Sequence, residues 1–174
     1  MVSVSKLSSK NSIPQQNWQT AIAFVLAFWL SSSVVIDALL MPVMAVSGMM
    51  TEPGFATAGY SLFWVFNRVE LLCAAIVLTG ALGLRHSSGR SIPHSVALSA
   101  LLGGIALIFT YGLTPQMSGL GLQLNLFTPP AETSALMDGL HLLYWLLEAA
   151  KLTIGALLLQ RSLQTARSSA SDRM

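Results

Sequence analysis

Four long apolar segments limit what this chain can fold into more than any other feature of its sequence. Each reaches or approaches the ~20 residues that an α-helix needs to cross ~30 Å of hydrocarbon at about 1.5 Å per residue. The segments lie at residues 18–44, 60–84, 94–113 and 136–159. They predict an all-α fold, a four-helix transmembrane bundle.

The composition supports a membrane protein rather than a soluble domain. Of the 174 residues, 53% are hydrophobic and only 9% are charged, whereas soluble domains carry about 25% charged residues. We predict one transmembrane domain at residues 17–161, between disordered cytoplasmic tails at residues 1–16 and 162–174. The apolar run from Trp18 is about twice as long as the core of a signal peptide, so we expect it to remain as the first helix.

Basic residues next to the spans predict the orientation of the chain. The two tails and the loop between the second and third spans contain seven Lys or Arg residues, whereas the other two loops contain only the acids Glu52 and Glu132. By the positive-inside rule, both termini then lie in the cytoplasm (N-in and C-in). Because the charges form no continuous basic face, we predict no nucleic-acid partner.

The fourth span carries a stripe of polar side chains on an otherwise apolar helix. Asp138, His141, Tyr144, Glu148 and Lys151 recur every three or four residues and therefore share one helix face. An ionisable side chain at the bilayer centre costs roughly 2.5 to 3.5 kcal/mol on insertion scales, so the stripe needs partners on neighbouring helices.

Polar residues of the first and second spans supply candidate partners. Counted along the predicted spans, Asp37 and Arg68 lie at similar depth, about 10 to 12 Å from the outer side, and Glu70 lies slightly deeper. We predict a polar seam inside the bundle, with His141 close to its outer mouth. The seam comprises Asp37, Asn67, Arg68, Glu70, His141, Tyr144, Glu148 and Lys151.

Two interpretations of this seam remain open from the sequence. In the structural one, Asp37 pairs with Arg68 and Glu148 pairs with Lys151, while Glu70 is protonated or hydrogen-bonded. In the functional one, the unpaired acid and the histidine of the fourth span form a polar path for a proton or small cation.

Signatures of metal, haem and enzyme chemistry are weak or absent. His86 and His94 flank the inner loop while His141 lies at the outer end, so no two histidines share the depth that a bis-His haem needs. Cys73 is the single cysteine, which excludes disulfides within the chain and multi-cysteine zinc sites. We predict no cofactor, no metal site and no catalytic residues. A membrane enzyme that uses Glu148 and His141 is a functional hypothesis that ranks below the two given at the end of this section.

Prolines occur at corresponding places in the first and third spans. We predict that Pro42 and Pro115 mark helix ends, because proline lacks a backbone N–H group. Arg68 and His141 each follow the corresponding proline by 26 residues. This spacing suggests either two parallel repeats of a helical hairpin or a chance coincidence.

Short motifs along the chain resemble a known family. They are DALLMPVM at residues 37–44, LFWVFNRVE at 62–70, TPQM at 114–117, and the Leu140-His141 pair. Together they resemble the bacterial domain-of-unknown-function family of four-helix membrane proteins related to the animal transmembrane protein linked with cisplatin resistance. The resemblance covers residues 20–160 and implies a four-helix bundle. That family has no firmly assigned activity.

The resemblance implies that Pro42, Pro115 and His141 are family positions. The chain departs from the family at two positions near Pro115 and His141. Gln116 stands where the family tends to have Arg, and Tyr144 stands where it tends to have a small Ser. They put an inherited ligand role there in doubt.

The leading functional hypothesis is a small multi-pass membrane protein that assists the movement of a proton, cation or small solute through the seam. Because four helices enclose little volume, a homo-oligomer or a larger membrane complex would complete the path. The alternative is a structural or assembly subunit of such a complex. The expected location is the lipid bilayer of a bacterial inner (plasma) membrane, with a thylakoid-type internal membrane as the alternative.

Overall fold

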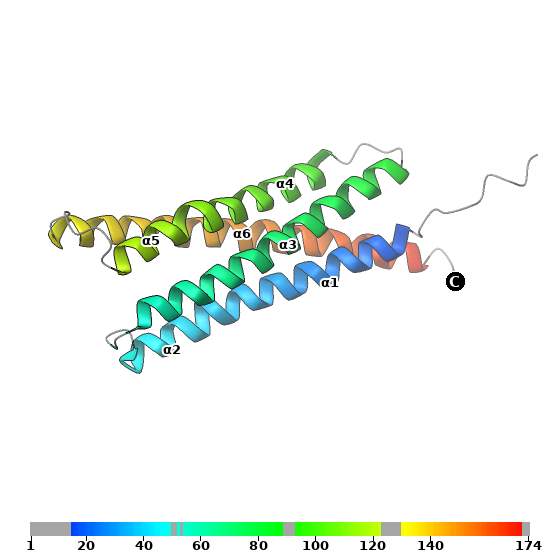
Figure 1. The fold of residues 1–174 in the computed structure, drawn as a ribbon. Coiled ribbons are helices and arrows are strands. Elements are labelled where there is room, and N and C mark those ends of the chain that lie inside the picture. The colour runs from blue at the N-terminus through cyan, green and yellow to red at the C-terminus, as the bar shows by residue number, and fades with distance from the viewer. Residues whose placement is uncertain (1–14, 50–51, 53, 89–92, 123–129, 172–174) are drawn as a thin grey trace, which may run out of the picture.

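The computed structural model describes residues 15–49, 52, 54–88, 93–122 and 130–171, and every regular element in these ranges is helical. The helical elements join into four rods (Figure 1). In chain order they are α1 (Gln15–Val34), η1 (Val35–Leu40), α2 (Met41–Val46), α3 (Phe55–Ser88), α4 (Pro93–Ile108), η3 (Phe109–Leu113), α5 (Thr114–Gly121) and α6 (Pro130–Ser171).

Each rod contains one stretch that is long and apolar enough to cross a membrane. The prediction of an all-α fold with four transmembrane helices is therefore confirmed, and the chain has the build of a small integral membrane protein. The orientation of the termini stays a prediction. The four stretches are Trp18–Val46, Phe55–Arg85, His94–Gly121 and Ala135–Thr165.

Both predicted helix-end prolines lie inside rods. Pro42 and Pro115 each follow a π-helical segment, η1 or η3, and occupy the first turn of the next α-helix. Proline cannot donate to the carbonyl four residues earlier and its ring crowds that group. A π turn relieves both problems, because the residue before each proline donates five residues back, from Met41 to Ile36 and from Thr114 to Phe109. The third span consequently extends beyond the predicted residue 113.

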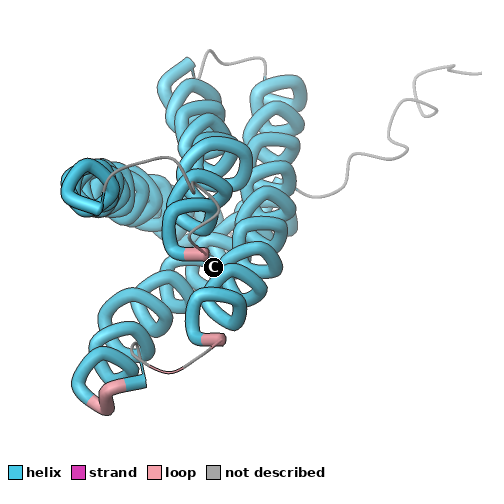
Figure 2. The backbone as a smooth tube through the Cα atoms, turned by 60° about the vertical axis from the view of Figure 1, so that its left-hand side comes forward, coloured by secondary structure: helices cyan, strands magenta, loops and turns pink. Residues whose placement is uncertain are grey.

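The rods form a ring in which each packs against two neighbours. In order around the ring they contain α1, α3, α4 and α6, with α6 returning to α1. The start of α1 and the end of α6 lie at one end of the bundle, here called the terminal end (right in Figure 1). The opposite end, formed by α2, α5 and the starts of α3 and α6, is called the distal end. There the rods separate, as Figure 2 shows, and α2 packs against no described residue of another rod.

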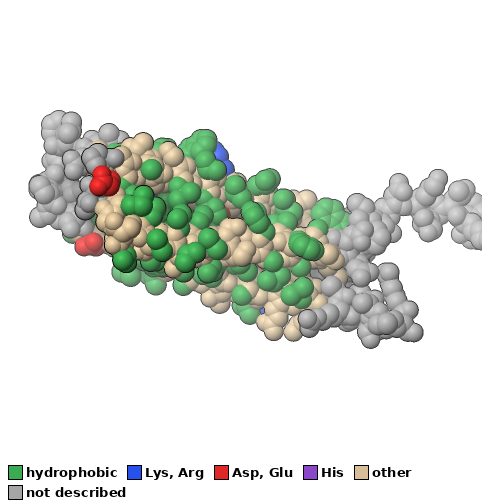
Figure 3. All heavy atoms as spheres, turned by 90° about the horizontal axis from the view of Figure 1, so that it is seen from below, with side chains coloured by type: hydrophobic (Ala, Val, Ile, Leu, Met, Phe, Trp, Pro, Cys, Tyr) green, Lys and Arg blue, Asp and Glu red, His purple; other side chains and the backbone are tan. Residues whose placement is uncertain are grey.

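An apolar core fills the terminal half of the bundle. Its buried members include Ile22 and Leu26 on α1, Val77 on α3 and Leu158 on α6. Gly155 brings α6 close to α1, because a Cβ at this position would lie 2.6 Å from Cδ2 of Leu30. Hydrophobic side chains also predominate across the outer face shown in Figure 3, as expected for a surface in contact with lipid.

The two predicted tails differ in outcome. Residues 1–14 lie outside the described residues, and α1 already begins at Gln15. At the other end, α6 continues through residues 162–171, which were assigned to a disordered tail. This stretch contains no glycine or proline and includes good helix formers such as Leu163 and Ala166, so the helix can propagate beyond the apolar segment.

Candidate functional site

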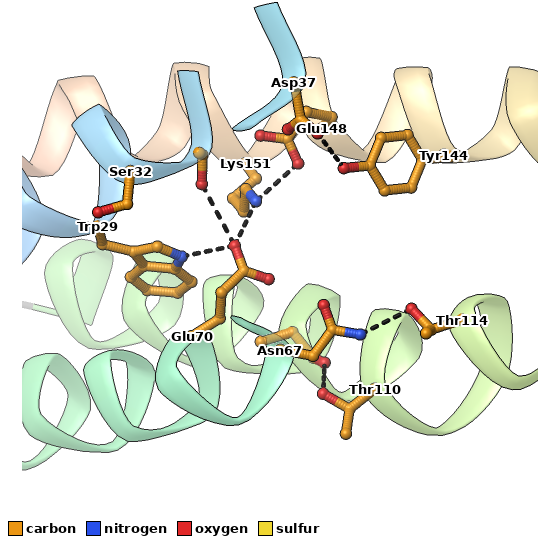
Figure 4. Close-up of polar contacts among 12 residues, drawn as sticks. Trp29, Ser32, Asp37, Asn67, Glu70, Thr110, Thr114, Tyr144, Glu148 and Lys151 are labelled. Atoms are coloured by element: carbon orange, nitrogen blue, oxygen red, sulfur yellow. Dashed lines mark hydrogen bonds and ion pairs between the residues drawn. The ribbon is translucent and has the colours of Figure 1, made fainter. Parts of the chain in front are cut away.

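A buried lysine lies at the centre of the polar interior (Figure 4). Lys151 Nζ on α6 is 2.5 Å from Glu70 Oε1 on α3 and 2.6 Å from Glu148 Oε2, one turn earlier on α6. Each of the three residues is only 1% exposed. A single ammonium group therefore joins two carboxylates from opposite rods inside the membrane-spanning region.

Glu70 is the most heavily hydrogen-bonded member of this group. Its Oε1 atom accepts from Lys151, from Trp29 Nε1 at 2.8 Å and from Ser33 Oγ at 3.3 Å. Trp29 and Ser33 lie on one face of α1, four residues apart. Three donors on one oxygen atom offset much of the cost of removing this carboxylate from water.

A third carboxyl group lies on the distal side of the lysine. Asp37 belongs to η1, is 5% exposed, and accepts a hydrogen bond of 2.5 Å from the Tyr144 hydroxyl through Oδ1. Its carboxyl group lies next to that of Glu148. Neither Oδ2 of Asp37 nor Oε1 of Glu148 has a hydrogen-bond partner among the described residues.

Aromatic rings separate these charges from the distal end. The Tyr144 ring lies 5.1 Å from the ring of Phe109 and 6.3 Å from that of Phe63, centroid to centroid. Phe109 also faces the lysine, with Lys151 Nζ 5.1 Å from its ring centroid, a cation–π distance. The buried carboxyl groups and the lysine are therefore separated from the distal end by side chains of α3, η3 and α6.

We call Asp37, Glu70, Glu148 and Lys151 the carboxylate–lysine cluster. With all three carboxyl groups ionised, the one ammonium group leaves a formal charge of −2. An uncompensated charge in a low-dielectric interior is strongly unfavourable, so the cluster must gain positive charge from outside the chain. Within the described residues, no three His, Cys, Asp or Glu side chains are arranged to hold a metal ion.

Two residues of the predicted seam lie outside it. Arg68 is exposed on the outer face of α3, where its guanidinium carbon lies 3.6 Å from the centroid of the Trp64 ring, and it forms no ion pair with Asp37. The reason is helical geometry: Asn67 and Glu70 share the inward face, and the one-residue step to Arg68 rotates the side chain by about 100°.

His141 is the second of these residues. It is exposed, and its Nδ1 atom lies 2.9 Å from the Met137 carbonyl of the same helix. Although it shares the stripe of Tyr144 and Glu148, α6 has already separated from η1 and α2 at this level. On this part of α6, Leu140 packs against the third rod, and the neighbouring His141 stays exposed.

Asn67 does face the interior, and the structure gives it a partner that the sequence analysis missed. Its Nδ2 atom donates to Thr114 Oγ1 on α5 at 2.7 Å. Trp29 and Ser33 were missed as well. A sequence signal for both existed, because Trp29, Ser33 and Asp37 recur at intervals of four on the first span and therefore continue one face.

Comparison of the chain with models of protein families, with curated proteins and with solved structures found no match. The family resemblance described above accordingly stays a prediction.

Proposed function

We propose that this chain transfers protons within the membrane through the carboxylate–lysine cluster. The observation that carries the proposal is the ammonium of Lys151, shared at 2.5 and 2.6 Å between carboxylates of α3 and α6 with almost no exposure to solvent. Ionisable groups that are buried in transmembrane helices commonly serve as proton relays. Because the cluster has a formal charge of −2 when all its carboxyl groups are ionised, binding of protons to it is favourable.

A proton fits this cluster better than a larger cation. The ammonium nitrogen and the two carboxylate oxygens already lie at charge-assisted hydrogen-bond distance, so no ion of greater size fits between them. Protonating a carboxyl group, in contrast, needs no additional volume. The unpartnered atoms, Asp37 Oδ2 and Glu148 Oε1, are the positions where a proton can be added without breaking a bond.

Tyr144 is suited to connect the cluster to the distal end. Its hydroxyl group donates to Asp37, and a phenolic hydroxyl can accept a second proton as it gives up the first. Tyr144 is only partly buried, whereas Asp37 beneath it is buried. A proton arriving from the distal end would therefore meet Tyr144 before it meets Asp37.

Among the described residues, the buried polar side chains in the terminal half of the bundle are Gln19 on α1 and Ser99 on α4, and neither is ionisable. The next buried polar side chain on α1 is Gln19, ten residues from Trp29 and therefore about 15 Å away along the helix. Ile22, Leu26 and Val77 fill the interval. Release to the terminal end therefore requires a second conformation or a partner, and the present structure corresponds to the state closed on that side.

Reconstitution into liposomes tests this proposal. Under an inside-negative potential, generated by potassium efflux from the liposomes, we expect proton uptake by the wild-type protein and at least a tenfold loss in Glu148→Gln, which cannot carry the proton. Thr153→Ala is the matched control, since Thr153 lies on the same helix, is exposed and bonds only to the Ala149 carbonyl. Wild-type uptake equal to that of protein-free liposomes, or full uptake by Glu148→Gln, would exclude the proposed role.

A second candidate, a subunit of a larger membrane complex, is favoured by one observation. Among the described elements, α2 contacts no helix of another rod, and Val43 and Val46 expose 57% and 91% of their surface. A partner helix could cover it. Crosslinking from position 46 in native membranes distinguishes the two candidates: a discrete protein adduct that is lost in Glu148→Gln supports the assembly role, and a normal adduct with lost proton uptake supports transfer.

A further inference from the structure

Arg68 is a cation on the lipid-facing surface without an acidic partner. It is exposed on α3, and the two ion pairs among the described residues both belong to Lys151. Its guanidinium group lies over the Trp64 ring, one helical turn nearer the distal end. The side chain thus extends along the helix towards the distal end rather than into the bundle, as a lipid-facing arginine does to reach the polar interface.

Taking Arg85, the basic residue that ends this span, as the edge of the hydrocarbon layer at the terminal end places the guanidinium of Arg68 near the opposite edge. Arg68 lies 17 residues before Arg85, the basic residue that ends this span, and thus about 26 Å from it along the helix. The turn towards Trp64 carries the charge a further few ångströms towards the distal end. For hydrocarbon ~30 Å thick, this is the level at which lipid phosphates begin.

A groove runs along the side of α3 next to the face that carries Arg68, with Val65 and Val69 in its lining. It runs between α1–η1 and α3, has a volume of about 550 Å³, and includes Phe28, Val35, Leu62 and Val69 in its lining. The α3 residues that line the groove lie between Leu62 and Val69, and Arg68 belongs to the same segment of the helix.

The polar groups in this groove have their protons engaged. Ser31 and Ser32 also line it, but both hydroxyl groups donate to the Phe28 carbonyl, at 3.0 and 2.8 Å. The groove therefore offers an almost wholly apolar surface, suited to a hydrocarbon chain rather than to a polar ligand.

A second copy of this chain does not provide the missing anion. Because Glu70 meets Lys151, Arg68 lies approximately level with Ala149 of α6. The acids near that level are buried inside the bundle. Asp138, the exposed acid of α6, lies about 16 Å nearer the distal end than Ala149, beyond the reach of an arginine in a copy of the same orientation.

We propose that Arg68 and this groove form a binding site for an anionic phospholipid of the leaflet at the distal end. The guanidinium group binds the lipid phosphate, for which its planar donors are well suited. One acyl chain lies in the groove and extends from the level of Leu62 towards Phe28. This site is independent of the proton-transfer proposal, since none of its residues belongs to the carboxylate–lysine cluster.

Native mass spectrometry of the full-length protein tests this site. The purified protein is mixed with equal amounts of phosphatidylglycerol and phosphatidylcholine, and retained lipid is counted after removal of the detergent. We expect the wild type to prefer the anionic lipid about fivefold, as one basic residue near the headgroups provides. Arg68→Gln should abolish the preference, and Arg68→Lys should keep part of it.

Two further variants test the two halves of the site. Val65→Phe fills the groove from an exposed position and should lower retention of both lipids. Arg161→Gln removes an exposed cation at the terminal end and should behave as the wild type. Undiminished preference in Arg68→Gln, an equal loss in Arg161→Gln, or unchanged retention in Val65→Phe would each overturn the proposal.

Discussion

Removing the buried cation should destabilise the bundle severely. In Lys151→Met, the side chain keeps most of its volume but loses the ammonium group that joins α3 to α6. Glu70 would keep its donors Trp29 and Ser33, whereas Glu148 would lose its ion pair and have no hydrogen-bond partner among the described residues. Because these side chains are 2% exposed or less, water cannot replace the missing charge.

The size of the loss follows from this geometry. Removing one partner of a buried ion pair costs about 3 to 5 kcal/mol, because the other charge stays buried without compensation. For a chain of this length, that corresponds to a melting temperature lower by about 6 to 20 °C. The loss should shrink in acidic buffer, because a protonated carboxyl group at position 148 needs no cation. Glu148→Gln in the Lys151→Met background should restore more than half of the lost stability.

Circular dichroism of the protein in a mild detergent measures these melting temperatures. Arg161→Met is the control, since Arg161 lies exposed on the same helix. The explanation would be refuted by a loss below about 1 kcal/mol in Lys151→Met at neutral pH. Failure of the additional Glu148→Gln change to restore stability would refute it equally, because the unpaired carboxylate is the assigned cause.

Two further predictions concern contacts around the cluster, and both are checked by the same melting experiments. Tyr144→Phe removes the hydrogen bond that Asp37 accepts at Oδ1 and should cost about 1 to 3 kcal/mol; an unchanged melting temperature would mean that this bond contributes nothing to stability. Gly155→Ala should destabilise by about 1 to 3 kcal/mol, because the added Cβ would lie 2.6 Å from Leu30. Gly139→Ala is its matched control on α6, with no atom within 4 Å, and should be neutral or slightly stabilising; equal effects of the two glycine changes would contradict the close helix contact.

Features that depend on a single helix could be predicted from the sequence. The four spans follow from apolar length, and the pairing of Glu148 with Lys151 follows from their spacing of three residues on one helix. The rotation of one helix relative to another is not contained in such spacing. The structural interpretation therefore pairs Asp37 with Arg68, whereas Asp37 meets Tyr144 and Arg68 faces outward.

Glu70 shows what tertiary packing adds. Its partners Lys151, Trp29 and Ser33 come from both ends of the sequence, and no local pattern links them to α3. The inward position of Glu70 could be inferred from the polar face that it shares with Asn67. The identity of its partners depends on α1 lying beside α3 and on α6 lying opposite α3 in the ring, which spacing within one span does not reveal.

The two prolines connect the local structure of the chain to its polar interior. In the first and third rods, a π turn precedes a proline, and the residue before that proline donates five residues back. The same local structure thus occurs twice. It lies at the two prolines that Arg68 and His141 each follow by 26 residues in the sequence. Each of these segments also holds a cross-rod hydrogen bond, from Tyr144 to Asp37 in one and from Asn67 to Thr114 in the other.

A π turn changes the direction in which the following residues face, and it is a natural place for a helix to bend. Among the described elements, the helix that follows η1 contacts no other rod, whereas the helix that follows η3 packs between α3 and α6. The two proline-containing segments are therefore held differently at the distal end. If the bundle opens towards that end, α2 can move by bending at η1 alone, and the bond it would strain first is the one between Tyr144 and Asp37, which closes the cluster on that side.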